Sequence, residues 1–526
     1  MALIKNKLSW IDGNAFFLMV LLANVAGLFF TKYYPTMDGP AHLYNSNVLS
    51  SLLMGDETLQ QFYSINLMPI PNWLSHVILA ISGVLLPAYL AEKVLLILYV
   101  AGMAISFRLL VVQFAPGNKS FSLLIFPFIY TFLFYLGFYN YSLSFIFFFL
   151  TVWIWNKHYT AGFTWEIKLL LTALITFTYL GNVLAYGFLG ITLGCLICYD
   201  ALRVYEQTND EVLSLKKCWS ELQLLLQMAL PSLLFFAVFY LNAQFFSTDQ
   251  RLPKEELIKW LMDNRSIIVY DYLKDEMYSK KIFWTMVLFV LCIAYRRIRE
   301  YELSNEISFS KSDVILAPLA LALAAFFLVP DGSGAGMMSI RYCILVSFLA
   351  VLWIATQQLP HFAKAFVLIV LFLSAGLFFN HTVVLQHLNK DAVALDEAAD
   401  HIEAGSLVLP VNHSENWLEI HFSNYIGVDK PMVILENYEA SVGWFPVRWN
   451  MDRMPRIVLD GKDQVGGVQW ISNPASVAVK PIDYVMIYGN LGKINDASCT
   501  ELKGVLDAGF TKVYSNEFVS LHKKKH

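Results

Sequence analysis

The chain is 526 residues long, and 57% of its residues are hydrophobic whereas only 15% are charged. Soluble domains carry about 25% charged residues, so this composition, with a mean hydropathy of +0.53, excludes an ordinary soluble protein and indicates a polytopic α-helical membrane protein. The formal net charge is −4, and nothing in the charge balance points to nucleic acid as a partner.

Apolar stretches predict the membrane spans, because a helix needs about 20 mostly apolar residues to cross a bilayer. The first stretch, Phe16 to Phe30, lacks a small-x-small cleavage site and further spans follow it, so we interpret it as a retained helix rather than a signal peptide. About eleven spans are predicted, at 14–31, 90–112, 121–136, 142–155, 167–180, 183–200, 222–244, 282–295, 313–329, 341–357 and 363–379.

Lys and Arg in the short loops predict the orientation, because these residues favour the cytoplasmic side. The opposite turns at 137–141 and 181–182 carry neither residue, and 330–341 carries only Arg341. The pattern predicts a cytoplasmic N-terminus and an extracytoplasmic C-terminus. The cytoplasmic segments then hold Lys5, Lys7, Arg108, Lys119, Lys157, Lys168, Arg203, Lys216, Lys217, Arg296, Arg297, Arg299, Lys311 and Lys364.

Residues 72–88 are apolar but short, and counting them as a span would place Arg108 and Lys119 outside. We therefore interpret this segment as a helix at the outer membrane surface, inside a first outer loop at 32–89. A second large outer loop is predicted at 245–281, where acidic and basic residues are frequent.

From Asp391 the composition becomes that of a soluble α/β domain. A helix is predicted over 391–404, closed by Gly405, with a further helix near 498–508. The predicted organisation is a transmembrane module over 1–384 and a small extracytoplasmic α/β domain over 385–526. Strands are predicted at Leu407–Val411, Met432–Leu435, Tyr484–Tyr488 and Phe518–His522.

The segment Pro35 to Tyr44, just past the first span, carries Asp38 and His42. A carboxylate at the membrane surface can act as a catalytic base when partial desolvation raises its pKa, and Asp38 is the candidate. The alternative is a helix cap, because Asp is a favoured cap and Pro40 suits the first turn. His42 would share a helical face with residue 38, where it could contact a phosphate, orient Asp38 or help to hold a divalent metal.

Arg341 opens an apolar helix on the predicted outer side. Its guanidinium offers a planar fork of donors that suits a phosphate. The alternative is an Arg that snorkels to the interface. The glycine-rich stretch before it lacks the Gly-Lys-Ser/Thr of a phosphate-binding loop and is interpreted as a flexible outer loop.

Two further groups combine aromatic and polar residues in the way that carbohydrate sites do. Tyr139 and Asn140 lie in a turn between spans, and Glu436, Tyr438 and Glu439 lie in the C-terminal domain. Aromatic faces pack on sugar rings while carboxylates accept hydrogen bonds from hydroxyls. Interfacial tyrosines are also common as membrane-belt residues, and such mixtures occur at domain interfaces.

The predicted architecture resembles the GT-C superfamily of membrane glycosyltransferases. It has an early Asp in the first outer loop, then surface helices, about ten further spans and an outer C-terminal domain. This superfamily includes protein O-mannosyltransferases and the lipid A aminoarabinose transferase. The resemblance covers the architecture of the whole chain, and its sequence motif is short. It implies that Asp38 lies in the active site, that Arg341 contacts the carrier phosphate, and that the sugar donor is polyprenyl-phosphate-linked. Many members pair the early Asp with a second acid, whereas Gly39 follows Asp38 here, which leaves a divalent metal possible and no cofactor certain.

The resemblance implies that a sugar is transferred, with inversion at its anomeric carbon, to a hydroxyl of a glycan, lipid or protein acceptor at the bilayer. In this reaction Asp38 removes the proton of the acceptor hydroxyl. Arg341 and His42 would stabilise the charge that develops on the phosphate. The compact chain suits a bacterial inner membrane with a periplasmic C-terminal domain. The alternatives are a transporter or flippase of lipid-linked saccharides, which would carry ionisable residues near the bilayer midplane, and a non-catalytic membrane scaffold.

Overall fold

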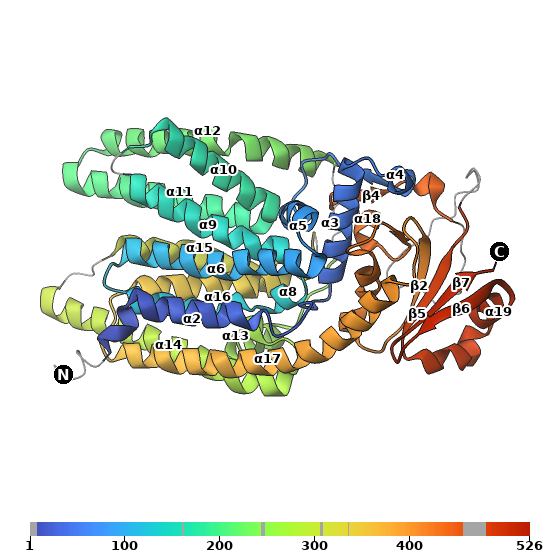
Figure 1. Cartoon of the computed structure of the whole chain (residues 1–526). Coiled ribbons are helices and arrows are strands. Elements are labelled where there is room, and N and C mark those ends of the chain that lie inside the picture. The colour runs from blue at the N-terminus through green and yellow to red at the C-terminus, as the bar shows by residue number, and fades with distance from the viewer. Residues whose placement is uncertain are drawn as a thin grey trace. The chain divides into compact units, whose positions relative to one another are not determined.

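The computed structural model describes residues 8–159, 162–242, 248–305, 309–334, 336–455 and 480–525. The chain forms two compact units that do not follow a single cut in the sequence (Figure 1). The first unit contains Met1–Gly27, Ile97–Tyr135 and Tyr139–Thr382, and the second contains Leu28–Leu96, Leu136–Phe138 and Val383–His526. Residues 245–247 of the predicted second outer loop and 456–479 of the predicted C-terminal domain lie outside the described residues.

The first unit is built from long helices that run side by side, with short helical segments between them (Figure 1). Helices α6 and α17 begin or end in the second unit. The elements are η1 (Ser9–Asp12), α2 (Asn14–Gly27), α6 (Ala88–Phe114), η2 (Lys119–Ile125), α7 (Phe126–Ile129), α8 (Phe132–Tyr135), α9 (Tyr139–His158), α10 (Trp165–Gly181), α11 (Val183–Thr208), α12 (Glu211–Asn242), α13 (Lys254–Met262), η3 (Arg265–Ile267), α14 (Tyr272–Ser304), η4 (Lys311–Ile315), α15 (Leu316–Leu328), α16 (Met338–Thr356) and α17 (Ala363–Ala399).

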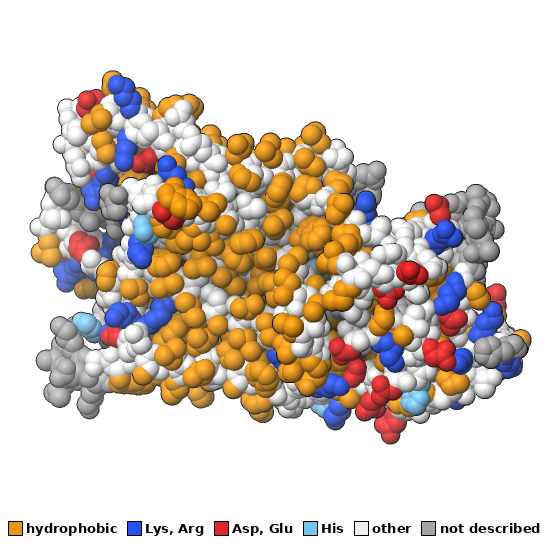
Figure 2. All heavy atoms as spheres, turned by 45° about the horizontal axis from the view of Figure 1, so that its top comes forward, with side chains coloured by type: hydrophobic (Ala, Val, Ile, Leu, Met, Phe, Trp, Pro, Cys, Tyr) orange, Lys and Arg blue, Asp and Glu red, His pale blue; other side chains and the backbone are white. Residues whose placement is uncertain are grey.

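Among the described residues, seven helices are long and apolar enough to cross a membrane, which indicates a multi-pass membrane protein. They coincide with seven of the predicted spans. Hydrophobic side chains cover a broad stretch of the surface in Figure 2, as a bilayer environment requires. The seven are Ala88–Phe114, Val183–Thr208, Glu211–Asn242, Tyr272–Ser304, Lys311–Leu328, Met338–Thr356 and Ala363–Ala399.

The other four predicted spans are not among these seven, and the count of eleven stays a prediction. Helix α2 has 14 residues and α10 has 17, while the range 142–155 lies within α9. The range 121–136 is not one helix but the succession η2, α7 and α8. Pro127 lies in this stretch, and its ring prevents a continuous ladder of helical hydrogen bonds.

Side chains from the predicted cytoplasmic loops meet one another in the first unit. Arg108 donates to Asn14 Oδ1 at 3.0 Å, and Lys311 pairs with Asp200 at 2.9 Å. The first contact joins α6 to α2 and the second joins η4 to α11.

The second unit contains a sheet with strand order β3-β2-β5-β7-β6 among the described residues. β2 pairs in parallel with β3 and β5, whereas β7 pairs antiparallel with β5 and β6. The four predicted strands and the helix predicted near 498–508 are confirmed, with ends shifted by one or two residues, whereas β6 was not predicted. The helix predicted over 391–404 is not a separate element, because α17 continues from the last predicted span to Ala399. The elements of the C-terminal segment are β2 (Leu407–His413), η5 (Trp417–Glu419), η6 (Phe422–Gly427), β3 (Val433–Ile434), α18 (Tyr438–Ser441), η7 (Met451–Arg453), β5 (Tyr484–Gly489), η8 (Leu491–Asn495), η9 (Ala497–Cys499), α19 (Thr500–Gly509), β6 (Phe510–Ser515) and β7 (Val519–Lys524).

Residues of the predicted first outer loop belong to this second unit. They form α3 (Gly39–Leu53), α4 (Glu57–Phe62), β1 (Tyr63–Ile65) and α5 (Leu74–Leu85), and β1 pairs antiparallel with β4 (Val447–Trp449). The Tyr44 hydroxyl on α3 donates to the Met432 carbonyl at 2.9 Å and accepts from the Ile434 amide at 3.0 Å. The predicted first outer loop and the C-terminal segment therefore share one core, although almost 400 residues separate Tyr44 from Met432.

Candidate functional site

Asp38 directly precedes α3, but its carboxylate does not cap that helix. Pro40 occupies the first turn, and the Asp38 side chain accepts no capping hydrogen bond from the described residues. The Gly39 amide donates instead to Thr36 Oγ1 at 3.0 Å. Capping therefore does not account for the Asp38 carboxylate.

The backbone around Asp38 is held against the turn at 136–138. The Asp38 amide donates to the Leu136 carbonyl at 3.0 Å. Gly137 has a φ of +88°, and a Cβ at this position would lie 2.9 Å from the Asp38 Cβ. Only glycine combines this backbone conformation with so close an approach, so Gly137 helps to position Asp38.

The Asp38 carboxylate is almost fully buried among ionisable and hydroxyl groups of the C-terminal segment. Its Oδ1 lies 3.7 Å from Nε2 of His421, and the Tyr438 hydroxyl lies against it. Burial raises the pKa of Asp38 above its usual value, although the nearby His421 and His42 act in the opposite direction. A raised pKa is what a carboxylate needs to accept a proton efficiently near neutral pH.

His421 connects Asp38 to a second buried carboxylate. Nδ1 of His421 lies 2.8 Å from Glu436 Oε1, and Glu436 Oε2 accepts from the Ser423 hydroxyl at 2.9 Å. The Tyr438 ring stacks on the imidazole with ring centres 4.2 Å apart. Burial lowers the pKa of His421, but the hydrogen bond to Glu436 and the combined attraction to Glu436, Asp38 and Glu439 raise it overall. These contacts favour a positively charged imidazole next to Asp38.

A second group consists of His42, His76 and Glu439. Oε1 of Glu439 lies 2.6 Å from His42 Nδ1, and Oε2 lies 2.7 Å from His76 Nε2. Burial raises the pKa of Glu439, but attraction to His76 and His42 dominates and brings it to about 2. One atom from each of these three side chains lies within 4.8 Å of the other two, so the group is able to hold a metal ion.

The second unit thus brings five of the residues predicted for the site into one cluster, in which Tyr438 is half-buried and the other four are buried: Asp38, His42, Glu436, Tyr438 and Glu439. Sequence reasoning did not select two others, His76 and His421. Their signal was weak but present, since His76 interrupts an apolar segment and His421 ends a run rich in acidic and aromatic residues. Because His76 and Glu439 are 363 positions apart, neither neighbourhood predicts their contact.

Arg341, Tyr139 and Asn140 belong to the first unit. Arg341 lies in the first turn of α16, and its Nε donates to the Gly336 carbonyl at 3.1 Å. Its guanidinium lies 5.7 Å from the centre of the Tyr141 ring. The side chain is buried rather than extended into solvent. Tyr139 and Asn140 form the start of α9 and are buried, and their contact with a sugar stays a prediction.

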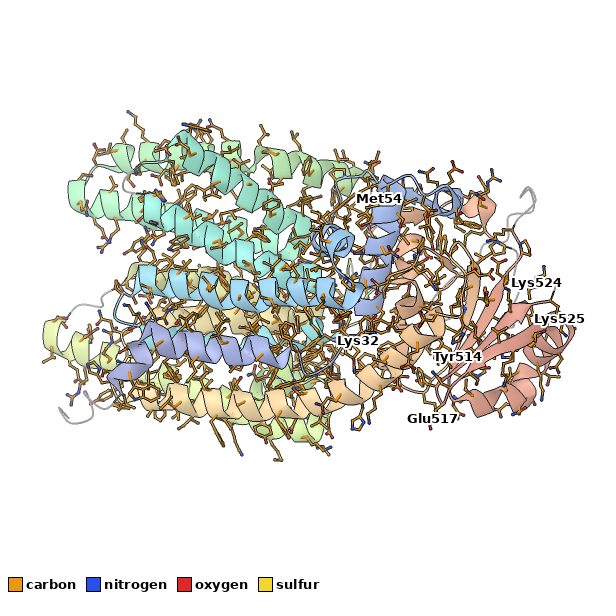
Figure 3. The ribbon with its side chains drawn as sticks, viewed as in Figure 1. Lys32, Met54, Tyr514, Glu517, Lys524 and Lys525 are labelled. Atoms are coloured by element: carbon orange, nitrogen blue, oxygen red, sulfur yellow. The ribbon has the colours of Figure 1, made fainter. Side chains whose placement is uncertain are left out.

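Two cavities in the second unit are lined by other residues than Asp38. One, of about 240 Å³, lies between α3 and α5, and Met54 of its lining is labelled in Figure 3. Its polar lining includes Ser46, Asn47 and Asp429. The other, of about 530 Å³, is open and lies between α4 and Asn450.

Comparison of the chain with protein-family models, with curated proteins and with solved structures gave no significant match in any of the three.

Proposed function

We propose that this chain is a glycosyltransferase of the GT-C type. It would move a sugar from a polyprenyl-phosphate carrier to an acceptor hydroxyl at the outer face of a bacterial inner membrane. The N-terminus would lie in the cytoplasm and the C-terminal segment in the periplasm, in accordance with the Lys and Arg pattern.

The observation that carries the proposal is the buried carboxylate of Asp38, which lies 3.7 Å from His421 and has a raised pKa because of its burial. Placing a carboxylate in such surroundings opposes folding, and perturbed acids of this kind are frequent at catalytic sites. The Asp38 side chain does not cap α3, so a role in local structure gives little reason for its presence.

In the proposed reaction, Asp38 removes the proton of the acceptor hydroxyl while the hydroxyl oxygen attacks the anomeric carbon. The bond from that carbon to the phosphate oxygen breaks, and the lipid phosphate leaves with the electron pair. His421, oriented by Glu436, would act as a positioning residue that stabilises the Asp38 carboxylate before proton transfer. Tyr438 and the acidic residues near it would border the acceptor.

Arg341 would bind the carrier phosphate, because a buried guanidinium in the first turn of an apolar helix suits an anion attached to a hydrocarbon chain. A phosphate contact from His42 would require that its contacts with Gly137 and Glu439 rearrange. Tyr139 and Asn140 remain candidates for contact with the sugar.

The test compares cells that lack the protein with cells that carry wild type, Asp38→Asn or the control Asp452→Asn. Asp452 is an exposed residue in the same unit, so its replacement controls for loss of one acid. Surface, lipid-linked and protein-linked glycans are profiled by mass spectrometry, and the membrane abundance of each variant is measured.

We expect Asp38→Asn to reproduce the glycan defect of the deletion at normal abundance, whereas Asp452→Asn retains the wild-type profile. A normal glycan profile with Asp38→Asn, combined with a defect on deletion, would reject the catalytic base and favour a transporter or scaffold. Accumulation of the lipid-linked donor on the cytoplasmic side in the deletion strain would favour a flippase.

A further inference from the structure

We propose that His42, His76 and Glu439 bind one divalent transition-metal ion, for which Zn²⁺ is the best fit. This proposal concerns ion binding and can be tested whether or not the chain transfers sugar. The three ligands come from α3, α5 and α18, and all three side chains are at most 4% exposed.

Both imidazole rings are anchored in the way that metal-binding histidines usually are. His42 Nε2 lies 2.9 Å from the Gly137 carbonyl oxygen, and His76 Nδ1 lies 3.2 Å from the Asn72 carbonyl oxygen. A carbonyl oxygen only accepts hydrogen bonds, so these nitrogens carry the hydrogens. Such contacts fix the tautomer and ring orientation of metal ligands.

Metal binding requires both imidazoles to be neutral, and with those hydrogens in place the second nitrogen of each neutral ring presents a lone pair to the same carboxylate. His42 Nδ1 and His76 Nε2 lie 2.6 and 2.7 Å from the Glu439 oxygens. Both atoms of each contact are then hydrogen-bond acceptors, and they repel one another. A cation between them removes this repulsion. Because Zn–N and Zn–O distances are about 2.0–2.2 Å in a tetrahedral site, an ion would widen these contacts by roughly 0.7 Å.

The surrounding packing holds the ligands in this geometry. The Phe445 ring packs against both imidazoles, with ring centres 6.0 Å from His42 and 5.6 Å from His76. The two imidazoles meet edge to face at 4.9 Å. Glu439 lies on α18, whose N-cap residue Asn437 is hydrogen-bonded to Asn45 of α3. Both α3 and the C-terminal segment are therefore needed to assemble the site.

The chemistry of the donor set selects the kind of ion. Two imidazoles and one carboxylate suit Zn²⁺ and similar ions, whereas Mg²⁺ and Ca²⁺ prefer oxygen ligands. Three protein ligands leave a fourth position, as in zinc sites that bind water or substrate.

The test uses the full-length protein in detergent, freed of any histidine tag and treated with a chelator. Zn²⁺ binding is measured by isothermal titration calorimetry and elemental analysis, and Co²⁺ is added as a spectroscopic probe of the coordination geometry. The variants are His76→Gln and Glu439→Gln, with His421→Gln as the control. His421 is a buried histidine of the same cluster that the proposed ligand set excludes.

We expect one Zn²⁺ per chain in the wild type and in His421→Gln, and binding weakened by roughly 100-fold or more in the two ligand variants. Zn²⁺, but not Mg²⁺, should raise the thermal unfolding temperature of the wild type. This wild-type measurement decides the question even if a variant fails to fold. Absence of stoichiometric Zn²⁺ or Co²⁺ binding by the folded wild type, or equal binding by Glu439→Gln, would overturn the proposed metal site and leave the group as a set of contacts between two histidines and Glu439.

Discussion

The side-chain amides of Asn45 and Asn437 exchange two hydrogen bonds, of 2.9 and 2.8 Å, inside the second unit. Both residues are completely buried. Asn45 lies on α3 one turn after Ala41, and Asn437 precedes Tyr438 and Glu439. The pair therefore links the helix that carries His42 to the segment that carries Glu436 and Glu439, two acids of the candidate site.

Replacement of Asn45 with Ala should destabilise the second unit by about 2–4 kcal/mol, because it removes three hydrogen bonds, two with Asn437 and one to the Ala41 carbonyl, and leaves the buried Asn437 amide without this partner. Asn47→Ala is the matched control on the same helix, since Asn47 makes one hydrogen bond, to the Gly427 carbonyl. Its expected loss is about 1 kcal/mol. Thermal unfolding of both variants in detergent measures the difference. An equal fall in the stability of both variants would mean that the Asn45–Asn437 pair contributes no more than the single hydrogen bond of Asn47.

Asp38→Asn should unfold at the same temperature as the wild type, or at a higher one, at neutral pH. The pKa of Asp38 is raised in the folded protein, so the folded state binds its proton more tightly than the unfolded chain does. Stability from this group is present at low pH and is lost as pH rises from the usual pKa through the raised one. Asn carries no charge and avoids this loss. A large fall in the unfolding temperature of Asp38→Asn at neutral pH would contradict a raised pKa for Asp38 in the folded protein.

The rate of the proposed sugar transfer should depend on pH with an acidic limb that lies above the usual pKa of an aspartate, because the proposed mechanism requires Asp38 to be ionised as the base. His421 lowers the pKa of Asp38, so His421→Asn should move this limb to higher pH as well as slow the reaction. Measured profiles of kcat/KM against pH for both proteins test this. A slower variant with an unchanged profile would limit His421 to a structural role.

Gly137→Ala should destabilise the protein by at least about 2 kcal/mol, since a side chain here combines a strained positive φ with a clash. The new Cβ would lie 2.9 Å from the Asp38 Cβ. Transfer should fall with it because Asp38 is displaced. Gly117→Ala, where no atom lies within 4 Å of the added carbon, serves as the control in the same thermal and activity assays. Similar behaviour of the two variants would argue against a tight approach at Gly137.

Arg341→Lys should reduce kcat/KM for the lipid-linked donor about tenfold or more, because Lys lacks the planar fork that binds a phosphate at two points. Arg251→Lys controls for the conservative change, since Arg251 is an exposed arginine of the same unit. Steady-state kinetics with varied donor separate this effect from a change in acceptor KM. If Arg341→Lys alters only acceptor KM, the phosphate assignment is wrong.

Local patterns predicted much of the secondary structure. The short strand-like runs at Leu407–Val411 and Tyr484–Tyr488 predicted β2 and β5, because a short apolar run is typical of a buried strand. Seven predicted spans coincide with long apolar helices for the same reason. Residues 121–136 were predicted as one span from their hydrophobicity, yet the chain there is broken into short segments around Pro127, since hydropathy does not register the missing amide of proline.

Composition and local pattern, which depend on a few neighbouring residues, were enough to predict the apolar helices, four of the C-terminal strands and Asp38 and His42 as candidates. The contact of Asp38 with His421, and of His42 and His76 with the same Glu439, follows only from the folded chain. So does the core that the first outer loop shares with the C-terminal segment. These contacts join residues more than 300 positions apart, and burial, which raises the pKa of Asp38, exists only once those distant segments have packed together.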